Sequence, residues 1–257
     1  DFLTDAAIDF IKSKDKKPWF LYLSYTAPHT PLQAKQKDLA ANTHIKDPNR
    51  RIFAGMMTCL DYNIGRILKH LDKLGVRENT LIVFLSDNGG PTSKNTSRNA
   101  PFSGVKGDVF EGGIRVPMIA SWPGTLAKGK VISDPVISLD LLPTFTAVAG
   151  SKAKLPRLEG KNLLPWLTGK AECPGDALFW SWRENFNAVR IGTLKEIRNG
   201  GPVKAIDGTA IPAHNFVDLA SNPRELAGEY ALKDEVKRKR LSTALDAWLS
   251  SVKEVAG

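Results

Sequence analysis

The segment Leu81-Ile-Val-Phe-Leu-Ser-Asp-Asn-Gly-Gly90 carries the strongest fold signal in this chain. Its apolar and β-branched residues follow one another without polar alternation, which is typical of a central parallel strand covered on both faces. Asp87 and Asn88 come directly after the apolar run. In open α/β sheets, ligands bind just beyond the carboxyl ends of the strands. The segment therefore predicts a buried strand that ends at a binding site with two oxygen-bearing side chains.

Helical and strand patterns flank this segment on both sides. Asp47 and Pro48 have the residue types of an N-cap and a first helical position, and apolar residues then recur every three to four positions until Gly75. The other predicted elements are a short helix capped by Thr4, a strand over residues 19–25, a strand over 116–122 and a helix over 139–149. This succession predicts an α/β fold with a mixed, largely parallel sheet flanked by helices.

The chain changes character around residues 152–175, where prolines and scattered glycines replace the long periodic segments. Shorter β-like pieces follow at 178–182, 188–191 and 216–219, and a last amphipathic helix contains the basic run Lys237-Arg-Lys-Arg240. We therefore expect residues 1–172 to belong to the α/β domain. Residues 173–257 are predicted to form a small C-terminal subdomain with an antiparallel sheet and a helix.

Composition excludes several classes of protein. The 257 residues are 42% hydrophobic and 25% charged, as expected of a globular fold, and no apolar run is long enough to span a bilayer. The net charge of +9 favours anionic ligands, although excess surface lysine explains most of it. Nucleic acid is a poor candidate, because the densest basic run lies on the solvated face of a helix. Cys59 and Cys173 have no metal-binding spacing, and a disulfide between them stays open.

Asp87 and Asn88 are the candidate metal ligands. Calcium takes six to eight oxygen ligands, mostly carboxylates and carbonyls, and these two side chains supply two or three. Adjacent residues on a strand point to opposite faces, so both can reach one ion only where the strand has ended, and Gly89 and Gly90 permit such a turn. The alternative is an Asx-turn, in which the side chain binds only its own backbone.

Two further residues are candidates for binding an anion. Lys106 lies between glycines in Gly104-Val-Lys-Gly107, where its ammonium group suits a sulfate or phosphate oxygen, unless it is one exposed loop lysine among many. His29 lies between two prolines in Ala27-Pro-His-Thr-Pro31, and its imidazole suits a sulfate oxygen or a departing alkoxide. Glu111 and Arg115 are expected to pair and to brace the loop without catalytic roles.

Several segments together resemble successive blocks of the sulfatase family. These blocks occur in family order: Ala27-Pro-His-Thr-Pro-Leu-Gln33, Asp61-Tyr-Asn-Ile-Gly-Arg66, Ser86-Asp-Asn-Gly-Gly90, Gly104-Val-Lys-Gly107, Glu111-Gly-Gly-Ile-Arg-Val-Pro117 and Asp140-Leu-Leu-Pro143. The later segment Phe216-Val-Asp-Leu-Ala-Ser-Asn-Pro-Arg-Glu225 is similar to the family's C-terminal subdomain.

The resemblance implies an alkaline-phosphatase-like fold and a sulfuric ester hydrolase. It implies calcium ligation by Asp87 and Asn88, and contact with the sulfate by Lys106 and His29. The expected substrate is a sulfated sugar or an aryl sulfate. A periplasmic, secreted or lysosomal-type compartment is implied by the resemblance alone.

The chain departs from the family at the nucleophile. The family's cysteine or serine, matured to formylglycine, lies in a C/S-x-P/A-x-R motif, and neither Cys59 nor Cys173 fits it. The paired aspartates that complete the calcium site also have no counterpart. We therefore expect the C-terminal portion of a sulfatase, inactive alone, with formylglycine upstream. The alternatives are a non-catalytic glycan-binding or regulatory relative, and a phosphatase or phosphonate hydrolase of the same superfamily.

Overall fold

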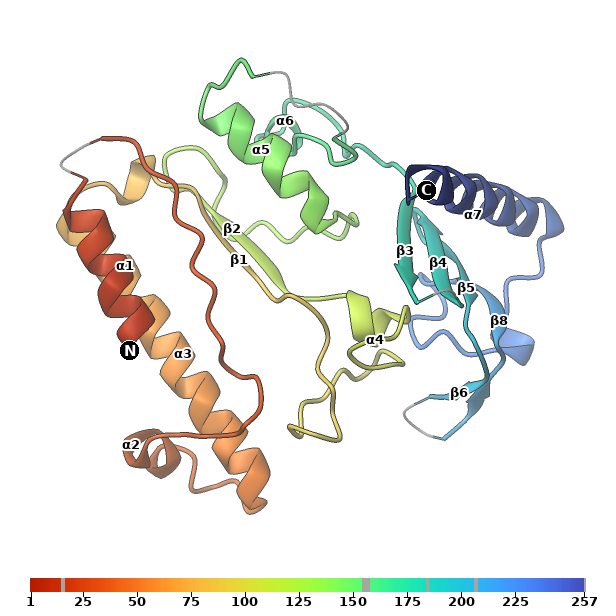
Figure 1. Ribbon diagram of the computed structural model, residues 1–257, viewed down its shortest axis with the longest axis horizontal. Coiled ribbons are helices and arrows are strands. Elements are labelled where there is room, and N and C mark those ends of the chain that lie inside the picture. The colour runs from red at the N-terminus through yellow and green to blue at the C-terminus, as the bar shows by residue number, and fades with distance from the viewer. Residues whose placement is uncertain (15–16, 154–157, 184, 206–207, 257) are drawn as a thin grey trace. The chain divides into compact units, whose positions relative to one another are not determined.

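The computed structural model describes residues 1–14, 17–153, 158–183, 185–205 and 208–256 (Figure 1). The chain forms two compact units. The first unit comprises residues 1–84, 90–98 and 118–124, and the second comprises residues 85–89, 99–117 and 125–257. The predicted domain boundary between residues 172 and 173 stays a prediction.

The first unit contains the helices α1 (Phe2–Lys12), α2 (Gln36–Ala40) and α3 (Pro48–Lys73). The predicted start of α3 is confirmed, because the Asp47 carboxylate accepts a hydrogen bond of 2.6 Å from the amide of Arg50. Pro48 occupies the first turn, and the helix ends just before Gly75, whose φ of +67° favours glycine. A single residue pattern thus predicted a 26-residue helix almost to its ends.

Helix α1 packs against α3 through apolar and ionic contacts. The guanidinium of Arg66 lies 2.5 Å from the Asp5 carboxylate, and burial of Ala7 and Ile11 completes the apolar face of α1. The prediction that Thr4 caps this helix is wrong. Thr4 lies inside α1, fully buried, with its hydroxyl 2.7 Å from that of Tyr25, because its position on the buried face outweighs its capping propensity.

Two predicted strands form a two-stranded sheet, β1 (Ile82–Leu85) with β2 (Met118–Ser121). The short helical turn η1 (Arg77–Asn79) precedes β1. The predicted strand over residues 19–25 is wrong as a strand: these residues alternate between exposed and half-buried, as a strand would, but they pair with no strand among the described residues. The largely parallel sheet stays a prediction.

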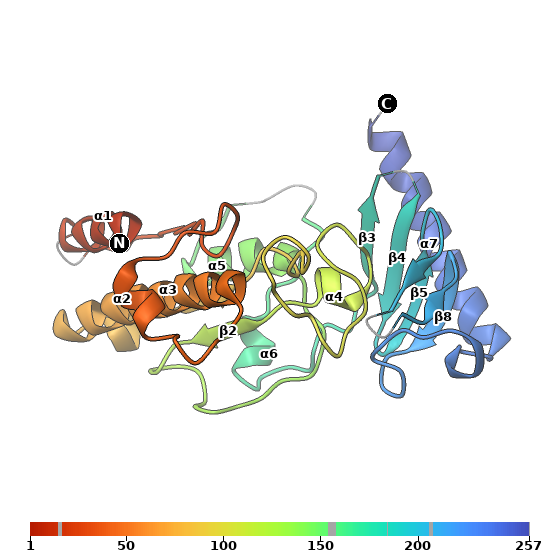
Figure 2. The same cartoon turned by 90° about the horizontal axis from the view of Figure 1, so that it is seen from below.

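The second unit contains the antiparallel sheet expected near the C-terminus. Its strand order is β3-β4-β5-β8, and Figure 2 shows α7 lying along one face. The strands are β3 (Leu178–Trp182), β4 (Phe186–Ile191), β5 (Leu194–Arg198) and β8 (His214–Asp218), and α7 spans Glu235–Ala256. A separate hairpin joins β6 (Val203–Lys204) to β7 (Ala210–Ile211). The strands β5, β6 and β7 were missed.

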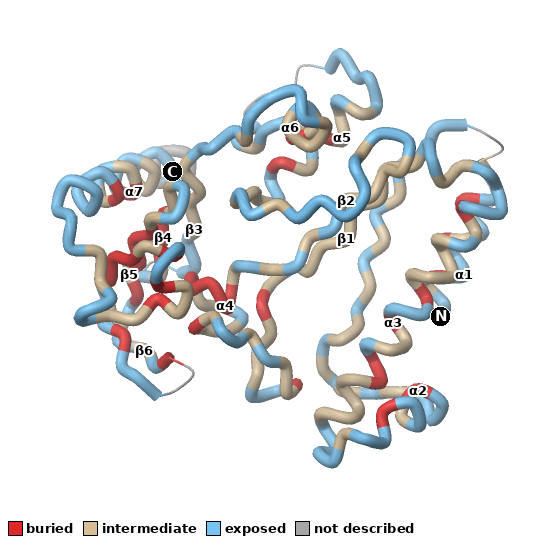
Figure 3. The backbone as a smooth tube through the Cα atoms, turned by 180° about the vertical axis from the view of Figure 1, so that it is seen from behind, coloured by how far each residue is buried: buried red, intermediate tan, exposed pale blue. Residues whose placement is uncertain are grey.

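The two faces of this sheet bury different kinds of residue, and Figure 3 shows β4 and β5 among the most buried segments. The face toward α7 is apolar, with Val189 and Phe216 packed against Leu241 and Leu245. The opposite face contacts the segment around Phe110 through an apolar cluster. The same face carries Arg190 and Lys195, whose side chains contact Glu111.

Short helical segments complete the second unit. They are α4 (Glu111–Ile114), η2 (Ser138–Asp140), α5 (Leu141–Val148), α6 (Leu164–Leu167) and η3 (Gly228–Tyr230). The helix predicted over residues 139–149 therefore corresponds to η2 and α5. Asp140 is buried, and its carboxylate accepts the amides of Ile137 at 2.9 Å and Lys161 at 2.8 Å. Both cysteines are free, half-buried thiols.

Candidate active site

Asp87 and Asn88 lie immediately after β1, at the position that the sequence predicted. The Asp87 side chain is exposed, and within the described residues its carboxylate has no hydrogen-bond or ion-pair partner. It does not close an Asx-turn through the amide of Gly89, because that amide donates to the carbonyl of Gly113 at 2.8 Å. The Nδ2 of Asn88 donates to the carbonyl of Gly89 at 2.9 Å, which orients the side chain.

Close backbone packing joins three segments of the site. A methyl group on Gly89 would lie 1.8 Å from the carbonyl oxygen of Gly112, and one on Gly112 would lie 2.4 Å from that of Ser103. The amide of Gly112 also donates to the carbonyl of Ser103 at 2.7 Å. Only glycine permits such an approach, so these two glycines fix the loop after β1, the lysine loop (residues 103–110) and α4 against one another.

Lys106 is exposed at the tip of the lysine loop. Its flanking glycines, Gly104 and Gly107, have φ values of +83° and +94°, as expected of a tight loop that only glycine accommodates easily. The Asp108 carboxylate accepts the amide of Val105 at 2.8 Å and closes the turn. Burial raises the pKa of Asp108. Within the described residues, the ammonium group of Lys106 forms no hydrogen bond or ion pair, so it is available to an anion.

Trp182 is a neighbour of this loop that the sequence did not reveal. Its indole is 50% exposed, and its Nε1 would lie 3.7 Å from a methyl group on Gly107. The guanidinium of Arg183 lies 5.7 Å from the indole ring centroid. A half-exposed aromatic side chain therefore lies beside the lysine loop, with a cation next to its ring.

His29 belongs to the first unit, whereas Lys106, Asp87 and Asn88 belong to the second. The imidazole is exposed, and its Nδ1 lies 2.7 Å from the carbonyl oxygen of Thr30. A carbonyl oxygen only accepts, so Nδ1 carries the proton and Nε2 of the neutral ring is an acceptor. Nε2 can donate to a sulfate oxygen only when the ring is an imidazolium.

The donor set of Asp87 and Asn88 fits part of a calcium site. A carboxylate without a protein partner and an amide oxygen are ligands of the type that calcium takes. Within the described residues, no three His, Cys, Asp or Glu side chains gather in a way that could hold a metal ion. The two residues therefore account for a minority of the six or more ligands that calcium requires.

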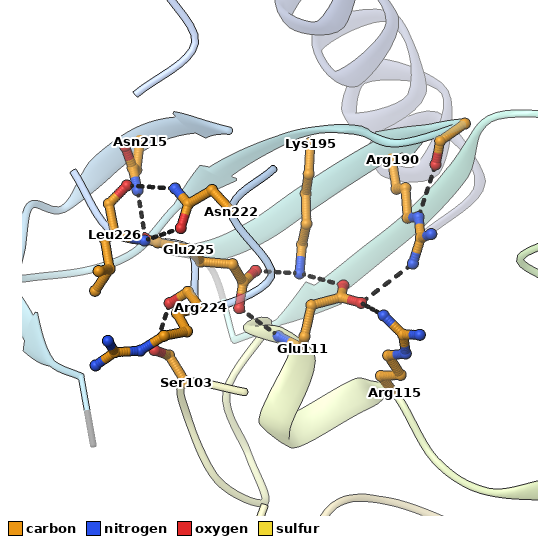
Figure 4. A network of polar contacts seen from close by, with 11 residues as sticks. Ser103, Glu111, Arg115, Arg190, Lys195, Asn215, Asn222, Arg224, Glu225 and Leu226 are labelled. Carbon is orange, nitrogen blue, oxygen red and sulfur yellow. Dashed lines mark hydrogen bonds and ion pairs between the residues drawn. The ribbon is translucent and has the colours of Figure 1, made fainter. Parts of the chain in front are cut away.

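Behind the lysine loop lies a buried network of charges (Figure 4). The predicted pairing of Glu111 with Arg115 is present at 3.8 Å. Closer partners of the Glu111 carboxylate are Lys195 at 2.9 Å and Arg190 at 3.1 Å. Lys195 also lies 2.7 Å from Glu225. Glu111, Lys195 and Glu225 are at most 1% exposed.

The two glutamates of this network differ in their affinity for a proton. Burial raises the pKa of Glu225 to about 7, because the attraction of Lys195 only partly offsets burial and the neighbouring Glu111 carboxylate adds to it. Burial alone would also raise the pKa of Glu111, but Lys195 and Arg190 outweigh it, so that pKa lies below its ordinary value. As the pH falls, Glu225 is therefore the first of the two to take up a proton.

The chain matches two known family models. Residues 1–151 match the sulfatase family, and residues 106–254 match the C-terminal region of N-sulphoglucosamine sulphohydrolase. The chain belongs to the sulfatase family. The sequence resemblance to this family is therefore confirmed.

Similar proteins cover most of this chain. Human steryl-sulfatase is 33% identical over 73% of it, and mouse N-acetylgalactosamine-6-sulfatase is 32% identical over 75%. The crystal structure of Ps i-CgsB superposes with a TM-score of 0.86 at 33% identity over 96% of the chain. Ps i-CgsB in complex with k-i-k-neocarrahexaose gives a TM-score of 0.80 at 35% identity over 89%.

The chain spans only part of these proteins. It covers 33% of human steryl-sulfatase, 37% of mouse N-acetylgalactosamine-6-sulfatase and 54% and 50% of the two Ps i-CgsB chains. Among the described residues, no helix has the length and apolar character needed to cross a membrane.

Proposed function

We propose that this chain supplies the sulfate-binding part and part of the calcium site of a sulfatase that acts on a sulfated sugar. The observation that carries the proposal is the packing of the loop after β1 against α4 and the lysine loop. It joins Asp87, whose carboxylate has no partner among the described residues, to a loop whose ammonium group has none there either. Hard oxygen donors and a free cation are the two kinds of group that a sulfate ester site requires.

Each residue has a distinct role in this proposal. The ammonium of Lys106 binds a sulfate oxygen as a compact charge and opposes the negative charge that develops in the transition state. The Nδ1 of His29 donates its proton to the carbonyl of Thr30, which leaves Nε2 to contact the sulfate or the leaving oxygen. Nε2 acts as a donor only when the ring is an imidazolium. Asp87 and Asn88 would hold calcium, which would supply Lewis-acid stabilisation of the sulfate oxygens.

The nucleophile of the proposed reaction lies outside these 257 residues. None of their cysteines or serines stands in a C/S-x-P/A-x-R motif. The family's nucleophile is a formylglycine, and the proposal assigns it to a segment upstream. The 257-residue chain by itself is then expected not to hydrolyse aryl sulfates.

A sulfated sugar is favoured over a small aryl sulfate as the natural substrate. The exposed indole of Trp182 lies beside the lysine loop, and an aromatic face is suited to the apolar side of a sugar ring. Ps i-CgsB, whose structure was solved with a neocarrahexaose, is among the similar proteins. The net charge of +9 is compatible with a polyanionic glycan.

A non-catalytic glycan-binding relative is the second candidate. The absence of the nucleophile motif from these residues favours it. Such a protein would use Lys106 and Trp182 to bind the same class of ligand without turnover. The two candidates differ in whether the full-length protein hydrolyses a sulfate ester at all.

The test is sulfate ester hydrolysis by the full-length protein and by its Lys106→Ala variant. Loss of one charge-stabilising donor typically lowers the rate by roughly a hundred- to a thousandfold. Lys128→Ala is a matched control, because Lys128 is also exposed and also precedes a glycine with positive φ, Gly129 at +68°. Equal rates in the two variants would contradict the role of Lys106. No hydrolysis by the unmodified full-length protein, with glycan binding retained, would favour the second candidate.

A further inference from the structure

The lysine loop is held at both ends by two adjacent residues of one turn that follows β8 (Figure 4). At its start, the hydroxyl of Ser103 donates to the carbonyl oxygen of Arg224 at 2.5 Å. Just beyond its end, the amide of Glu111 donates to the carboxylate of Glu225 at 2.7 Å. Residues 121 and 114 positions apart in sequence thus fix the two ends of the segment that presents Lys106.

The turn that makes these contacts, residues 222–226, is itself fixed by side-chain amides. The Oδ1 of Asn222 accepts the amide of Leu226 at 3.0 Å, and its Nδ2 donates to the carbonyl of Leu226 at 2.8 Å. The Nδ2 of Asn215, on β8, donates to the carbonyl of Glu225 at 2.8 Å. Asn215 and Asn222 are both buried. These hydrogen bonds hold the backbone of the turn against the sheet.

Glu225 itself has a strained backbone, with a φ of +59°. Residues other than glycine adopt this conformation at a cost, and it persists only where the surroundings impose it. Its carboxylate accepts from the amide of Glu111 and from the ammonium of Lys195, and Lys195 also contacts the Glu111 carboxylate. The carboxylate is therefore held from two sides, by partners that also contact each other.

Stability alone is a poor explanation for this arrangement. Desolvation of buried ion pairs commonly offsets their attraction, so an apolar contact would hold the subdomain equally well. A directional anchor is what an apolar contact does not provide. The anchored segment includes Gly113, whose carbonyl accepts the amide of Gly89, next to Asn88. That hydrogen bond holds the loop after β1 to α4, whereas the contacts of residues 224 and 225 act on the two ends of the lysine loop.

We propose that the turn formed by residues 222–226 is a positioning element for Lys106, with Glu225 as its principal positioning residue. The inference rests on the proposed sulfate-binding role of Lys106. A displacement of about 1 Å at a reacting group can lower a rate by a hundredfold, so an anchor of this kind has a direct effect on turnover. Glu225 acts only through the loop and touches no substrate.

The test is a double-mutant cycle between Glu225→Gln and Lys106→Ala in the full-length protein. Glutamine has a similar shape but only one acceptor oxygen, so it satisfies either the Glu111 amide or Lys195, not both. We expect Glu225→Gln alone to lower kcat/KM for an aryl sulfate by at least tenfold relative to the unmodified full-length protein. In the Lys106→Ala background the same substitution should change kcat/KM by less than twofold, because the group that it positions is gone. The matched control is Glu229→Gln, which changes an exposed glutamate in the next turn.

A second variant covers the case in which Glu225→Gln does not fold. Ser103→Ala removes only the hydrogen bond to the carbonyl of Arg224 and leaves all charges in place. Alone, it should also lower kcat/KM, whereas in the Lys106→Ala background it should have little effect. Thermal unfolding checks that each variant is folded. Hydrogen exchange of the Glu111 and Gly112 amides should be faster in both variants.

Two outcomes separate this inference from the proposed function. If Lys106→Ala lowers activity but Glu225→Gln and Ser103→Ala reduce it equally with and without Lys106, the positioning role is overturned and the proposed function stands. If Lys106→Ala itself has no effect, the role of Lys106 and the positioning role both fail.

Discussion

Lys106 and Lys195 place the same ammonium group in opposite surroundings within one unit. Lys106 is exposed at the tip of a glycine-flanked loop, and within the described residues it has no ion-pair partner. Lys195 is fully buried between two glutamates, 2.9 Å from Glu111 and 2.7 Å from Glu225. A free surface cation is available to an external anion, whereas a paired, buried cation is available only to the fold. Lys106 is thus suited to binding a ligand, whereas Lys195 stabilises the fold. Substitutions at the two positions should therefore have different effects.

The largest expected difference is in stability. Lys195→Met leaves two buried carboxylates without their shared cation, which should lower the free energy of unfolding by about 3–5 kcal/mol. Lys106→Met changes an exposed side chain, and its effect should stay within about 0.5 kcal/mol. Urea denaturation of both variants at neutral pH measures the difference. Similar unfolding free energies would mean that the buried network is not organised around Lys195.

A smaller effect is expected from pH. The pKa of Glu225 is about 7 in the folded chain and 4.5 for the free side chain, so folding favours the protonated form. Its contribution to stability is therefore fully present below pH 4.5 and is lost as the pH rises through 7. At about 1.4 kcal/mol for each unit of pKa shift, the loss is on the order of 3–4 kcal/mol.

The measurement that checks this is the unfolding free energy between pH 4.5 and 8, for the parent and for Glu225→Gln. The variant carries no ionisable group at this position and should show a shallower decline over the same range. Glu229→Gln, at an exposed position, should follow the parent. Parallel curves for Glu225→Gln and the parent would show that another group titrates in this window.

The smallest expected effect concerns calcium binding at the exposed loop after β1. Asp87 and Asn88 provide only a few of the six or more ligands that calcium needs, so the 257-residue chain should bind it weakly or not at all. Asp87→Ala should then leave the calorimetric titration of this chain almost unchanged, as should Asp72→Ala, which removes an exposed carboxylate from α3. Tight binding that only Asp87→Ala abolishes would mean that these residues hold a complete site.

The elements that the sequence predicted well are those whose signals are local. The N-cap at Asp47 and the apolar period that follows it describe α3 almost to its ends, because capping and amphipathicity act within a few residues. The apolar run before Asp87 likewise identified β1 as a strand, although its residues are half-buried and not buried as predicted, and the glycines around Lys106 correctly indicated a tight loop. These features need no knowledge of what packs against them.

Strand β5 and the charge network were missed because their signals are not local. The sequence Leu194-Lys-Glu-Ile-Arg198 has too many charges to be read as a buried strand, yet Lys195 and Glu196 are both fully buried. Their burial is possible only because partners arrive from distant positions, as Glu111 does for Lys195. Conversely, residues 19–25 have the composition of a strand but pair with none of the described strands. Pairing between distant segments is not encoded in any single window.

The sequence by itself determined the family, the α/β class and the identities of Asp87, Asn88, Lys106 and His29 as candidate site residues, since ordered motifs and local turn chemistry specify them. Only the tertiary structure decided which groups are free and which are fixed. It left the carboxylate of Asp87 exposed and enclosed that of Glu225. The physical reason is that availability and pKa depend on burial and on charges brought together by folding, and these contacts join residues more than a hundred positions apart.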